Sequence, residues 1–544
     1  MTSSSSLTQT AGTPPLTDLL AALSHPASYS HHPASVEVMQ THISAVFLAG
    51  DEVYKLKKPV KFSFLNYSTL ELRRHYCEEE VRLNHRLAPT VYLGVVPVLR
   101  TRDGYRVREV ANMQDATVVD YLVRMRRLPP ERTLAALITN GRVTKFGIHT
   151  LAKRLVHFHN TAATSSAAAY GAPAVVWQAL ADNFHTTAQF VGHTMSERQY
   201  TVIQTFSKQF FANHQELLKT RVLQDRVREG HGDLRCDHVY FLDDGIAIID
   251  CIEFNPRLRT CDVASELAFL AMDLELRGAV SWADELVHTY ATLAEDDALL
   301  TLLPFYQCYR AYVRGKVESL KSIEPEIPTA EQEQARQQAQ RSFRLAERYA
   351  RGAPAPALIV ICGQIGTGKS TVAQHVSEQT GFAVLNSDVI RKQLAGLLPT
   401  ACAAAEYQAG LYQPDVTRKT YEARHQTAEE ELRSGRGVIL DATYKHPEDR
   451  RLVLELSARC QVPLLFIECQ ASMATVERRL REREQRGDAV SDATWTLAQR
   501  EREHFPAFTE FPPQCHIVID AESDIDVQLA RVENQLWMSR KGNA

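Results

Sequence analysis

The residues whose types and spacing could do chemistry lie in two separate parts of the chain. In the second half, the run LIVICGQIGTGKST contains Gly-x-x-x-x-Gly-Lys-Ser directly after an apolar stretch. A phosphate chain needs several converging backbone N–H groups, which a glycine-permissive loop at a helix N-terminus can present. The run therefore predicts a site for ATP. Its expected ligands are Gly363, Gly366, Gly368, Lys369, Ser370 and Thr371.

Polar residues that follow two further apolar strands are expected beside this loop. Lys369 would contact the β- and γ-phosphates. Ser370 would hold Mg²⁺ together with Asp441, which ends the buried strand in GVILDATY. In LNSDVIRKQL, Asp388 is followed one helical turn later by Arg391. Because ligands bind at the carboxyl ends of parallel strands, Asp388 could accept a proton from a substrate hydroxyl and Arg391 could hold a phosphate. The alternative is that these are a helix cap, a solvated arginine and an ordinary strand-end aspartate.

A charged stretch farther along the chain, VERRLREREQRGDAVSDAT, is rich in arginine. Its arginines alternate with glutamates, and they are Arg478, Arg479, Arg481, Arg483 and Arg486. Charge-laced helices are usually solvated faces. Behind a phosphate-binding loop, however, an arginine-rich helix can close as a lid and neutralise charge on a transferring phosphoryl group. We expect this lid function here, with Arg483 and Arg486 as the catalytic arginines.

The first half contains a second constellation. The run HGDLRCDHVYFLDDGIAIIDCIEF places Asp233 on a loop and Asp250 after a hairpin, where one could position a hydroxyl and the other could bind Mg²⁺. Upstream, EVYKLKK places Lys55 on a strand and CEEEVRLNHRL places Glu80 on the following helix. Alone, each would more often be a surface residue. Together, a strand lysine, a helix glutamate and two aspartates predict an ATP site of the protein-kinase type.

The elements that must position these residues divide the chain into two domains. Residues 1–35 are expected to be mostly disordered, because their start is rich in Ser, Thr and Pro. Residues 36–322 combine an antiparallel strand-rich lobe with a mainly helical lobe, which predicts an α+β domain. Residues 323–356 are expected to form a helical connector and a Pro/Ala linker. Residues 357–544 alternate apolar strands with helices, which predicts an α/β domain with a parallel sheet.

The composition restricts the class of protein. Of the 544 residues, 44% are hydrophobic and 23% are charged, without a run of about 18 uncharged apolar residues. We therefore expect a globular protein without a membrane span or secretory signal. Ten cysteines without a C-x-x-C pair indicate a reducing, cytoplasmic location. The net charge of −4 disfavours nucleic acid as a partner, although local basic patches keep it an open alternative. The sequence does not indicate an oligomeric state.

The segment from about residue 357 to residue 521 resembles the small P-loop kinases that phosphorylate hydroxyl groups. These include gluconate kinase, chloramphenicol phosphotransferase and the kinase domain of polynucleotide kinase. The shared pattern is the P-loop, then Asp388 with Arg391 three residues later, then an arginine-bearing lid. The resemblance implies that Asp388 is the base toward the substrate hydroxyl. It specifies phosphoryl transfer better than it specifies the acceptor.

The first half resembles the aminoglycoside phosphotransferase-like family, which is similar in fold to protein kinases. HGDL, residues 231–234, matches the catalytic loop of that family. The resemblance implies that Asp233 is the catalytic base and Asp250 the metal-binding aspartate. Where the family has a metal-binding asparagine, this chain has His238, a poorer ligand for Mg²⁺. This half also lacks a G-x-G-x-x-G loop. We expect weak ATP binding, a different metal arrangement or a regulatory pseudokinase.

Taken whole, the chain resembles bacterial proteins described as bifunctional aminoglycoside phosphotransferase and ATP-binding protein. We therefore expect a phosphotransferase that uses ATP and Mg²⁺ and acts on a small hydroxyl-bearing molecule. The kinase-like half is expected to be a second phosphotransferase or a ligand sensor. Two alternatives stay open: a nucleotide-dependent regulator without acceptor chemistry, and a polynucleotide 5′-hydroxyl kinase.

Overall fold

The fold is taken from a computed structural model of the chain. It describes residues 14–62, 65–102, 104–107, 117–164, 167–352, 354–397, 411, 413–486, 495–502, 505–506, 508, 511, 515–525, 527–529, 532 and 536. Among these residues, the helices are too short or too polar to cross a membrane.

The chain begins with a small lobe built on an antiparallel sheet. The sheet has the order β1-β2-β3-β8-β6-β7. Its strands are β1 (Val36–Gln40), β2 (Ser44–Ala49), β3 (Glu52–Lys57), β6 (Tyr92–Thr101), β7 (Gly104–Val107) and β8 (Thr117–Arg126). Helix α2 (Leu70–His85) contacts β6 and β8, and Thr69 caps it by accepting a hydrogen bond from the N–H of Leu72. A short ribbon of β4 (Lys61–Phe62) and β5 (Leu65–Asn66) precedes α2. The sheet and α2 confirm the predicted strand-rich lobe with a helix packed on it.

Helix α1 (Leu16–Leu23) lies against this sheet, with Leu19 and Leu23 buried in its core. It falls in the part of the chain that we expected to be mostly disordered. Two leucines spaced one helical turn apart are enough to hold the short helix on the sheet.

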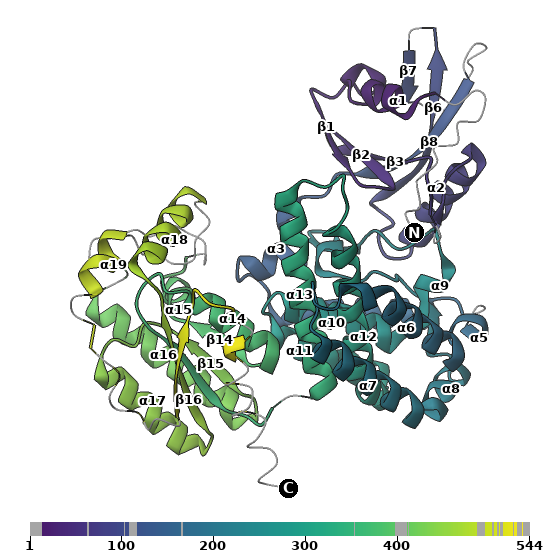
Figure 1. Cartoon of the computed structure of the whole chain (residues 1–544). Coiled ribbons are helices and arrows are strands. Elements are labelled where there is room, and N and C mark those ends of the chain that lie inside the picture. The colour runs from purple at the N-terminus through teal and green to yellow at the C-terminus, as the bar shows by residue number, and fades with distance from the viewer. Residues whose placement is uncertain are drawn as a thin grey trace.

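A larger helical lobe follows below the sheet (Figure 1). Its helices are α3 (Leu134–Thr139), α4 (Lys145–Thr161), α5 (Ala167–Tyr170), α6 (Pro173–Thr187), α7 (Glu197–Asn213), α8 (Gln215–Leu223), α9 (Pro256–Arg259), α10 (Val263–Leu276), α11 (Val280–Ala294), α12 (Asp297–Lys321) and α13 (Thr329–Arg351). Its short strands are β9 (Val227–Glu229), β10 (Val239–Leu242), β11 (Gly245–Ile248) and β12 (Thr260–Asp262). Strands β10 and β11 form the hairpin predicted after the HGDL loop.

Helix α10 is the centre of the helical lobe. Twelve of its fourteen residues are buried, so it is covered nearly all round rather than along one stripe. Helix α13 packs along α12 and also contacts α7. Its Phe343 is fully buried, with the ring beside Gly315 of α12. It occupies the segment that the sequence suggested as a connector, and small residues such as Ala339 and Ala346 let it lie close to α12.

The C-terminal domain is a parallel sheet between layers of helices. The sheet has the order β14-β15-β13-β16-β17 and all its pairings are parallel. Its elements are β13 (Leu358–Cys362), α14 (Lys369–Thr380), β14 (Ala383–Asn386), α15 (Ser387–Leu394), α16 (Pro414–Arg433), β15 (Val438–Asp441), α17 (Pro447–Cys460), β16 (Leu464–Gln470), α18 (Met473–Arg486), α19 (Trp495–Arg502) and β17 (His516–Asp520). The predicted α/β fold class is confirmed.

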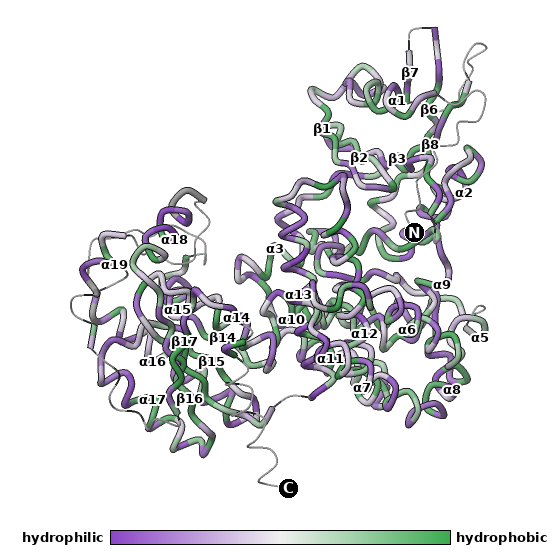
Figure 2. The backbone as a smooth tube through the Cα atoms, in the orientation of Figure 1, coloured by the Kyte–Doolittle hydropathy of each residue, from purple (hydrophilic) through white to green (hydrophobic). Residues whose placement is uncertain are grey.

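The strands of this sheet are apolar on both faces because helices cover both. All five residues of β13 are buried, and Figure 2 shows the neighbouring strands in the green of hydrophobic residues. Helix α14 contacts α13 of the helical lobe, so the two domains touch through the helix that follows the glycine-rich loop. Figure 1 shows the domain beside the helical lobe, on the side away from the small β lobe.

The packing of α13 on α12 can be tested by Gly315→Ala. A Cβ atom at Gly315 would lie 2.6 Å from Cε1 of the buried Phe343 ring. Overpacking of this kind costs about 1–3 kcal/mol, which exceeds the roughly 1 kcal/mol that alanine gains over glycine in a helix. We expect a lower free energy of unfolding in a urea titration. Val317→Ala, at an exposed position of the same helix, is the control and should change stability by less than about 0.5 kcal/mol. A Gly315→Ala variant as stable as wild type would contradict this packing.

Candidate functional site

The glycine-rich loop connects β13 to α14 and has the backbone that a phosphate cradle needs. Gly363, Gly366 and Gly368 all have positive φ, and a Cβ at Gly363 would lie 2.5 Å from the carbonyl oxygen of Cys469. Only glycine fits there, for reasons of both backbone conformation and space. The Lys369 ammonium donates to the carbonyl oxygen of Gln364 at 2.7 Å, so the side chain folds back over the loop. Thr371 is exposed on the first turn of α14.

Asp441 lies at the carboxyl end of β15 beside this loop. Its Oδ2 accepts hydrogen bonds from Ser370 Oγ at 2.8 Å and from Asn386 Nδ2 at 2.6 Å. Burial raises the pKa of Asp441, against the opposing influence of Lys369 and of these two hydrogen bonds. A divalent cation would offset the cost of burying this carboxylate. The hydroxyl of Ser370 and the carboxylate of Asp441 are oxygen donors of the kind that Mg²⁺ prefers, so these residues fit the ion.

Asp388 and Arg391 lie on α15 next to this edge of the sheet. They form an ion pair one helical turn apart, and the Arg391 side chain is buried. Asn386 caps the helix by accepting hydrogen bonds from the backbone N–H groups of Asp388 and Val389. Asn386 thus joins the cap of α15 to Asp441. The sequence analysis did not single it out, although its position at the end of an apolar strand was a usable signal.

The predicted arginine lid is described only in part. Arg478 and Arg481 are exposed and pair with glutamates on their own helix, as a solvated helix face would. Arg479 instead donates to the carbonyl oxygens of Thr367 at 3.2 Å and Ala521 at 2.7 Å, so it holds the glycine-rich loop. Of the two arginines that we favoured, Arg483 is half-buried on α18. The side chain of Arg486 and the following residues 487–494 lie outside the described part of the chain.

A buried arginine supports the loop that follows Asp441. Arg424 of α16 is fully buried and donates to the hydroxyl of Tyr444 at 2.8 Å and, more distantly, to the carbonyl oxygen of Asp441 at 3.4 Å. Its guanidinium also lies 4.2 Å from the ring centre of Tyr421. Tyr444 has a positive φ of 51°, which is costly for an aromatic residue. Arg424 and its aromatic neighbours therefore hold a strained loop in place. No spacing rule in the sequence points to this contact.

In the first half of the chain, the structure brings Lys55, Glu80 and Asp250 together. Lys55 Nζ lies 2.9 Å from Glu80 and 2.7 Å from Asp250. A second lysine, Lys57, lies 2.6 Å from the other oxygen of Glu80 and also pairs with Glu253. The positive charge of Lys55 holds the pKa of Asp250 well below its usual range. The result is a chain of alternating charges that begins at Asp250 and ends at Glu253 in the large lobe and passes through the small lobe. We did not single out Glu253 from the sequence.

The HGDL loop is fixed from below by α10. Glu266 accepts hydrogen bonds from the N–H groups of His231 at 2.7 Å and Gly232 at 2.6 Å. Asp233, the expected base, forms a bidentate ion pair with Arg235, in which both N–O distances are 3.0 Å. Burial alone would raise the pKa of Asp233, but Arg235 and then His238 lower it to about 2. A carboxylate held in this way is a weak base at neutral pH.

The metal ligands expected in this half do not form a magnesium site of the usual kind. His238 Nδ1 donates to the carbonyl oxygen of Asp233 at 2.8 Å, and its Nε2 lies 3.8 Å from Asp250 Oδ2. A nitrogen donor is poorly suited to Mg²⁺, and Asp250 already pairs with Lys55. We therefore assign no metal-dependent step to this half.

Comparison with known proteins agrees with a two-domain chain. Residues 358–506 match the family model described as AAA domain. The fold and the site thus define a protein that joins a kinase-like domain to a P-loop domain. The chain belongs to the family of the uncharacterized protein Rv2004c of Mycobacterium tuberculosis and the uncharacterized protein Mb2027c of Mycobacterium bovis. It is 30% identical to each over 472 residues, which cover 86% of this chain and 90% of the relative.

Solved structures resemble parts of the chain. A choline/ethanolamine kinase family protein from Mesorhizobium loti is 10% identical, covers 61% of this chain and 99% of its own length, and has a TM-score of 0.36. A putative kinase from Chloroflexus aurantiacus is 20% identical, covers 34% of this chain and 99% of its own length, and has a TM-score of 0.28. Likenesses of this size carry no argument about activity. The resemblance to bifunctional aminoglycoside phosphotransferase and ATP-binding proteins stays a prediction.

The burial of His231 predicts a pH dependence of stability. Burial lowers the pKa of this imidazole to about 4, whereas an unfolded histidine titrates near pH 6.5. Because the folded protein binds this proton less readily than the unfolded chain, the neutral imidazole contributes its full stability above about pH 6.5. This contribution is lost as the pH falls toward 4. His231 alone should lower the free energy of unfolding by about 2 kcal/mol between pH 7 and pH 5. We expect the melting temperature of wild type to fall further over this range than that of His231→Gln. Equal falls in both proteins would contradict the assignment.

Proposed function

We propose that the C-terminal domain transfers the γ-phosphate of ATP to a hydroxyl group of a small-molecule acceptor. The observation that carries the proposal is the convergence of the glycine-rich loop, the hydrogen-bonded Ser370–Asp441 pair and the Asp388–Arg391 pair at one edge of the parallel sheet. Phosphoryl transfer depends mainly on positioning and on electrostatic stabilisation. This edge offers phosphate-binding amides, a lysine, a metal-binding pair, a carboxylate and an arginine.

The proposed step uses these residues as follows. The amides of the loop and Lys369 bind the β- and γ-phosphates, and Ser370 with Asp441 holds Mg²⁺, which draws charge from the phosphate oxygens when bound. Asp388 accepts the proton of the acceptor hydroxyl as its oxygen bonds to the γ-phosphorus. The bond from that phosphorus to the bridging oxygen breaks, and ADP leaves with the electron pair. Arg391, which pairs with Asp388 in the structure, stabilises charge on the transferred group.

For the N-terminal domain we propose a ligand sensor that binds nucleotide, rather than a second transferase. The specific observation is the ion pair of Arg235 with Asp233, which occupies both oxygens of the expected base. His238 in place of a metal-binding amide supports the same conclusion. The Lys55–Glu80 pair, in contrast, is the arrangement that positions nucleotide phosphates in kinase-like folds.

Transfer activity is tested with full-length protein, γ-³²P-labelled ATP and a pooled extract of small metabolites. Lys369→Ala should remove label transfer to background, and Asp388→Asn should lower it by about 10²–10⁴-fold, the usual contribution of a general base. Asp233→Asn is the matched control in the other domain and should retain transfer. Label that appears in a 5′-hydroxyl oligonucleotide but in no metabolite would show that the acceptor is a polynucleotide and not a small molecule. Nucleotide binding without transfer to either would favour a regulator.

The sensor role is tested by nucleotide binding to a chain whose P-loop site is disabled. In a Lys369→Ala background, we expect residual ATP binding that Lys55→Met weakens by tenfold or more, since the buried lysine is the one expected to contact phosphate. This residual binding should be equally strong with EDTA and with Mg²⁺, because the metal ligands do not fit. Acceptor phosphorylation by Lys369→Ala that is lost on Asp233→Asn would show that this half is a transferase.

A further inference from the structure

The two domains meet at a set of buried ion pairs around the end of α14. Glu378 lies in the last turn of this helix, and its side chain is only 2% exposed. Arg341 of α13 binds one of its oxygens at 2.6 Å, and Arg344 of the same helix binds the other at 3.1 Å. Burial alone would raise the pKa of Glu378, but these two arginines hold it below its usual value. Both arginines thus belong to one domain and the carboxylate to the other.

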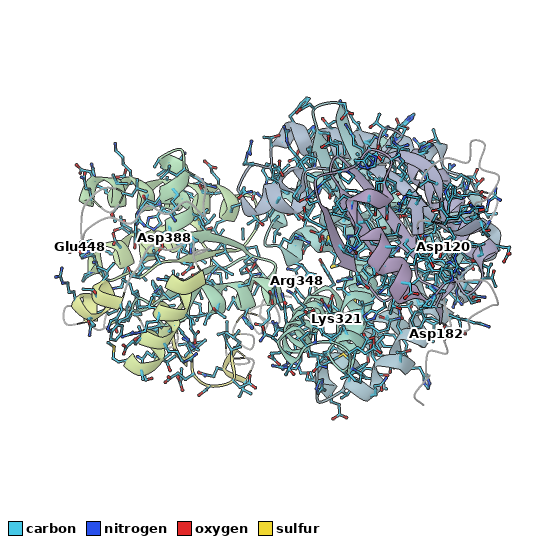
Figure 3. All side chains as sticks on the ribbon, turned by 90° about the horizontal axis from the view of Figure 1, so that it is seen from above. Asp120, Asp182, Lys321, Arg348, Asp388 and Glu448 are labelled. Carbon is cyan, nitrogen blue, oxygen red and sulfur yellow. The ribbon has the colours of Figure 1, made fainter. Side chains whose placement is uncertain are left out.

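A third arginine extends this junction into the helical lobe. Arg348 of α13 pairs with Glu275 of α10 and donates to the carbonyl oxygen of Ser377 at 3.4 Å. Gly381, which ends α14 with a φ of +78°, makes room for it, because a Cβ there would lie 3.1 Å from Arg348 Nη1. Figure 3 labels Arg348 where the two parts of the chain meet. The ion pairs and the glycine together seat the end of α14 on the other domain.

The elements on either side of this junction reach both candidate sites. Helix α14 begins at Lys369 of the glycine-rich loop, about 14 Å along its axis from Glu378. Helix α10 carries Glu275 near its end and Glu266 near its start, where Glu266 binds the HGDL loop. Two stiff helices therefore run from the junction, one to the phosphate-binding loop and one to the loop of the kinase-like domain.

We propose that Glu378 and its arginine partners are positioning residues of the P-loop site, through which the kinase-like domain controls nucleotide binding by the C-terminal domain. The inference rests on the proposed function, because it assigns regulation to that site. If α14 is released at its end, the amides and the lysine at its start lose their fixed placement. Glu378→Gln keeps the shape of the side chain but removes its charge. It therefore leaves the buried Arg344 and the partly exposed Arg341 without their carboxylate.

The experiment measures the affinity of full-length protein for a fluorescent ATP analogue, mant-ATP. Binding that is lost in Lys369→Ala reports the P-loop site, and binding lost in Lys55→Met reports the kinase-like site. We expect Glu378→Gln to weaken the P-loop site by about five-fold or more, in the usual range of coupling between sites. Glu275→Gln, which lies in the other domain, should act in the same direction. The matched control is Glu429→Gln, which changes a partly exposed partner of Arg433 and Arg459 and should change the affinity less than two-fold.

A purely structural role would leave a different pattern. Glu378→Gln and the milder Arg341→Gln would then lower the melting temperature while the folded protein, measured well below that temperature, bound mant-ATP at the P-loop site as wild type does. That result would overturn the inference and leave the proposed function intact. Wild-type binding that does not depend on Lys369 would instead overturn the proposed function, and the inference with it.

Discussion

The carboxylate of Asp441 is the point on which the C-terminal site depends. It is buried at the end of a central strand, where it receives hydrogen bonds from Ser370 of the P-loop helix and from Asn386 at the end of the neighbouring strand. One charged group thus fixes the first turn of α14 and the cap of α15 relative to each other. Burying a carboxylate with only neutral donors hydrogen-bonded to it is costly. A bound cation would repay that cost at the place where phosphate charge must be neutralised.

The kinase-like domain handles buried charge differently. Its network already contains both signs, from Asp250 through Lys55, Glu80 and Lys57 to Glu253. In such a network each charge is paired with an opposite charge. Removal of one member therefore leaves the next charge buried without its partner. Arg235 satisfies Asp233 in the same way. Arg235 engages both oxygens of Asp233, whereas Arg391 pairs with Oδ1 of Asp388. We assign the two domains different roles because of this difference.

The sequence was most informative where chemistry is encoded locally. Gly363 to Ser370, the strands of the parallel sheet and the β10–β11 hairpin follow from short-range spacing, and the structure has them where they were expected. Lys55 and Glu80 could be paired because the order of elements is that of a kinase-like lobe. The contacts of Arg235, Arg424 and Arg479 could not be foreseen, because an arginine reaches partners in several directions and its sequence context does not select one.

Contacts between domains were the least predictable. Glu378 sits in an ordinary helical stretch, HVSEQT, and nothing near it marks a residue that will be buried. Its burial depends on Arg341 and Arg344, which lie in a polar helix that composition alone suggested to be a connector. Helix α13 is polar where it is exposed, and its buried residues include small ones such as Ala335, Ala339 and Ala346. A pattern of small rather than large apolar residues was the one signal that could have shown it to be packed.

If Asp441 places a metal ion at the phosphates, Asp441→Asn must change the Mg²⁺ dependence of phosphoryl transfer. Asparagine preserves the shape of the side chain and its contact with Ser370 but removes the negative charge. We expect the variant to need at least about tenfold more Mg²⁺ for half-maximal transfer, because the loss of a metal-orienting contact typically lowers metal affinity by about 10–100-fold. An unchanged Mg²⁺ requirement and an unchanged rate would contradict it.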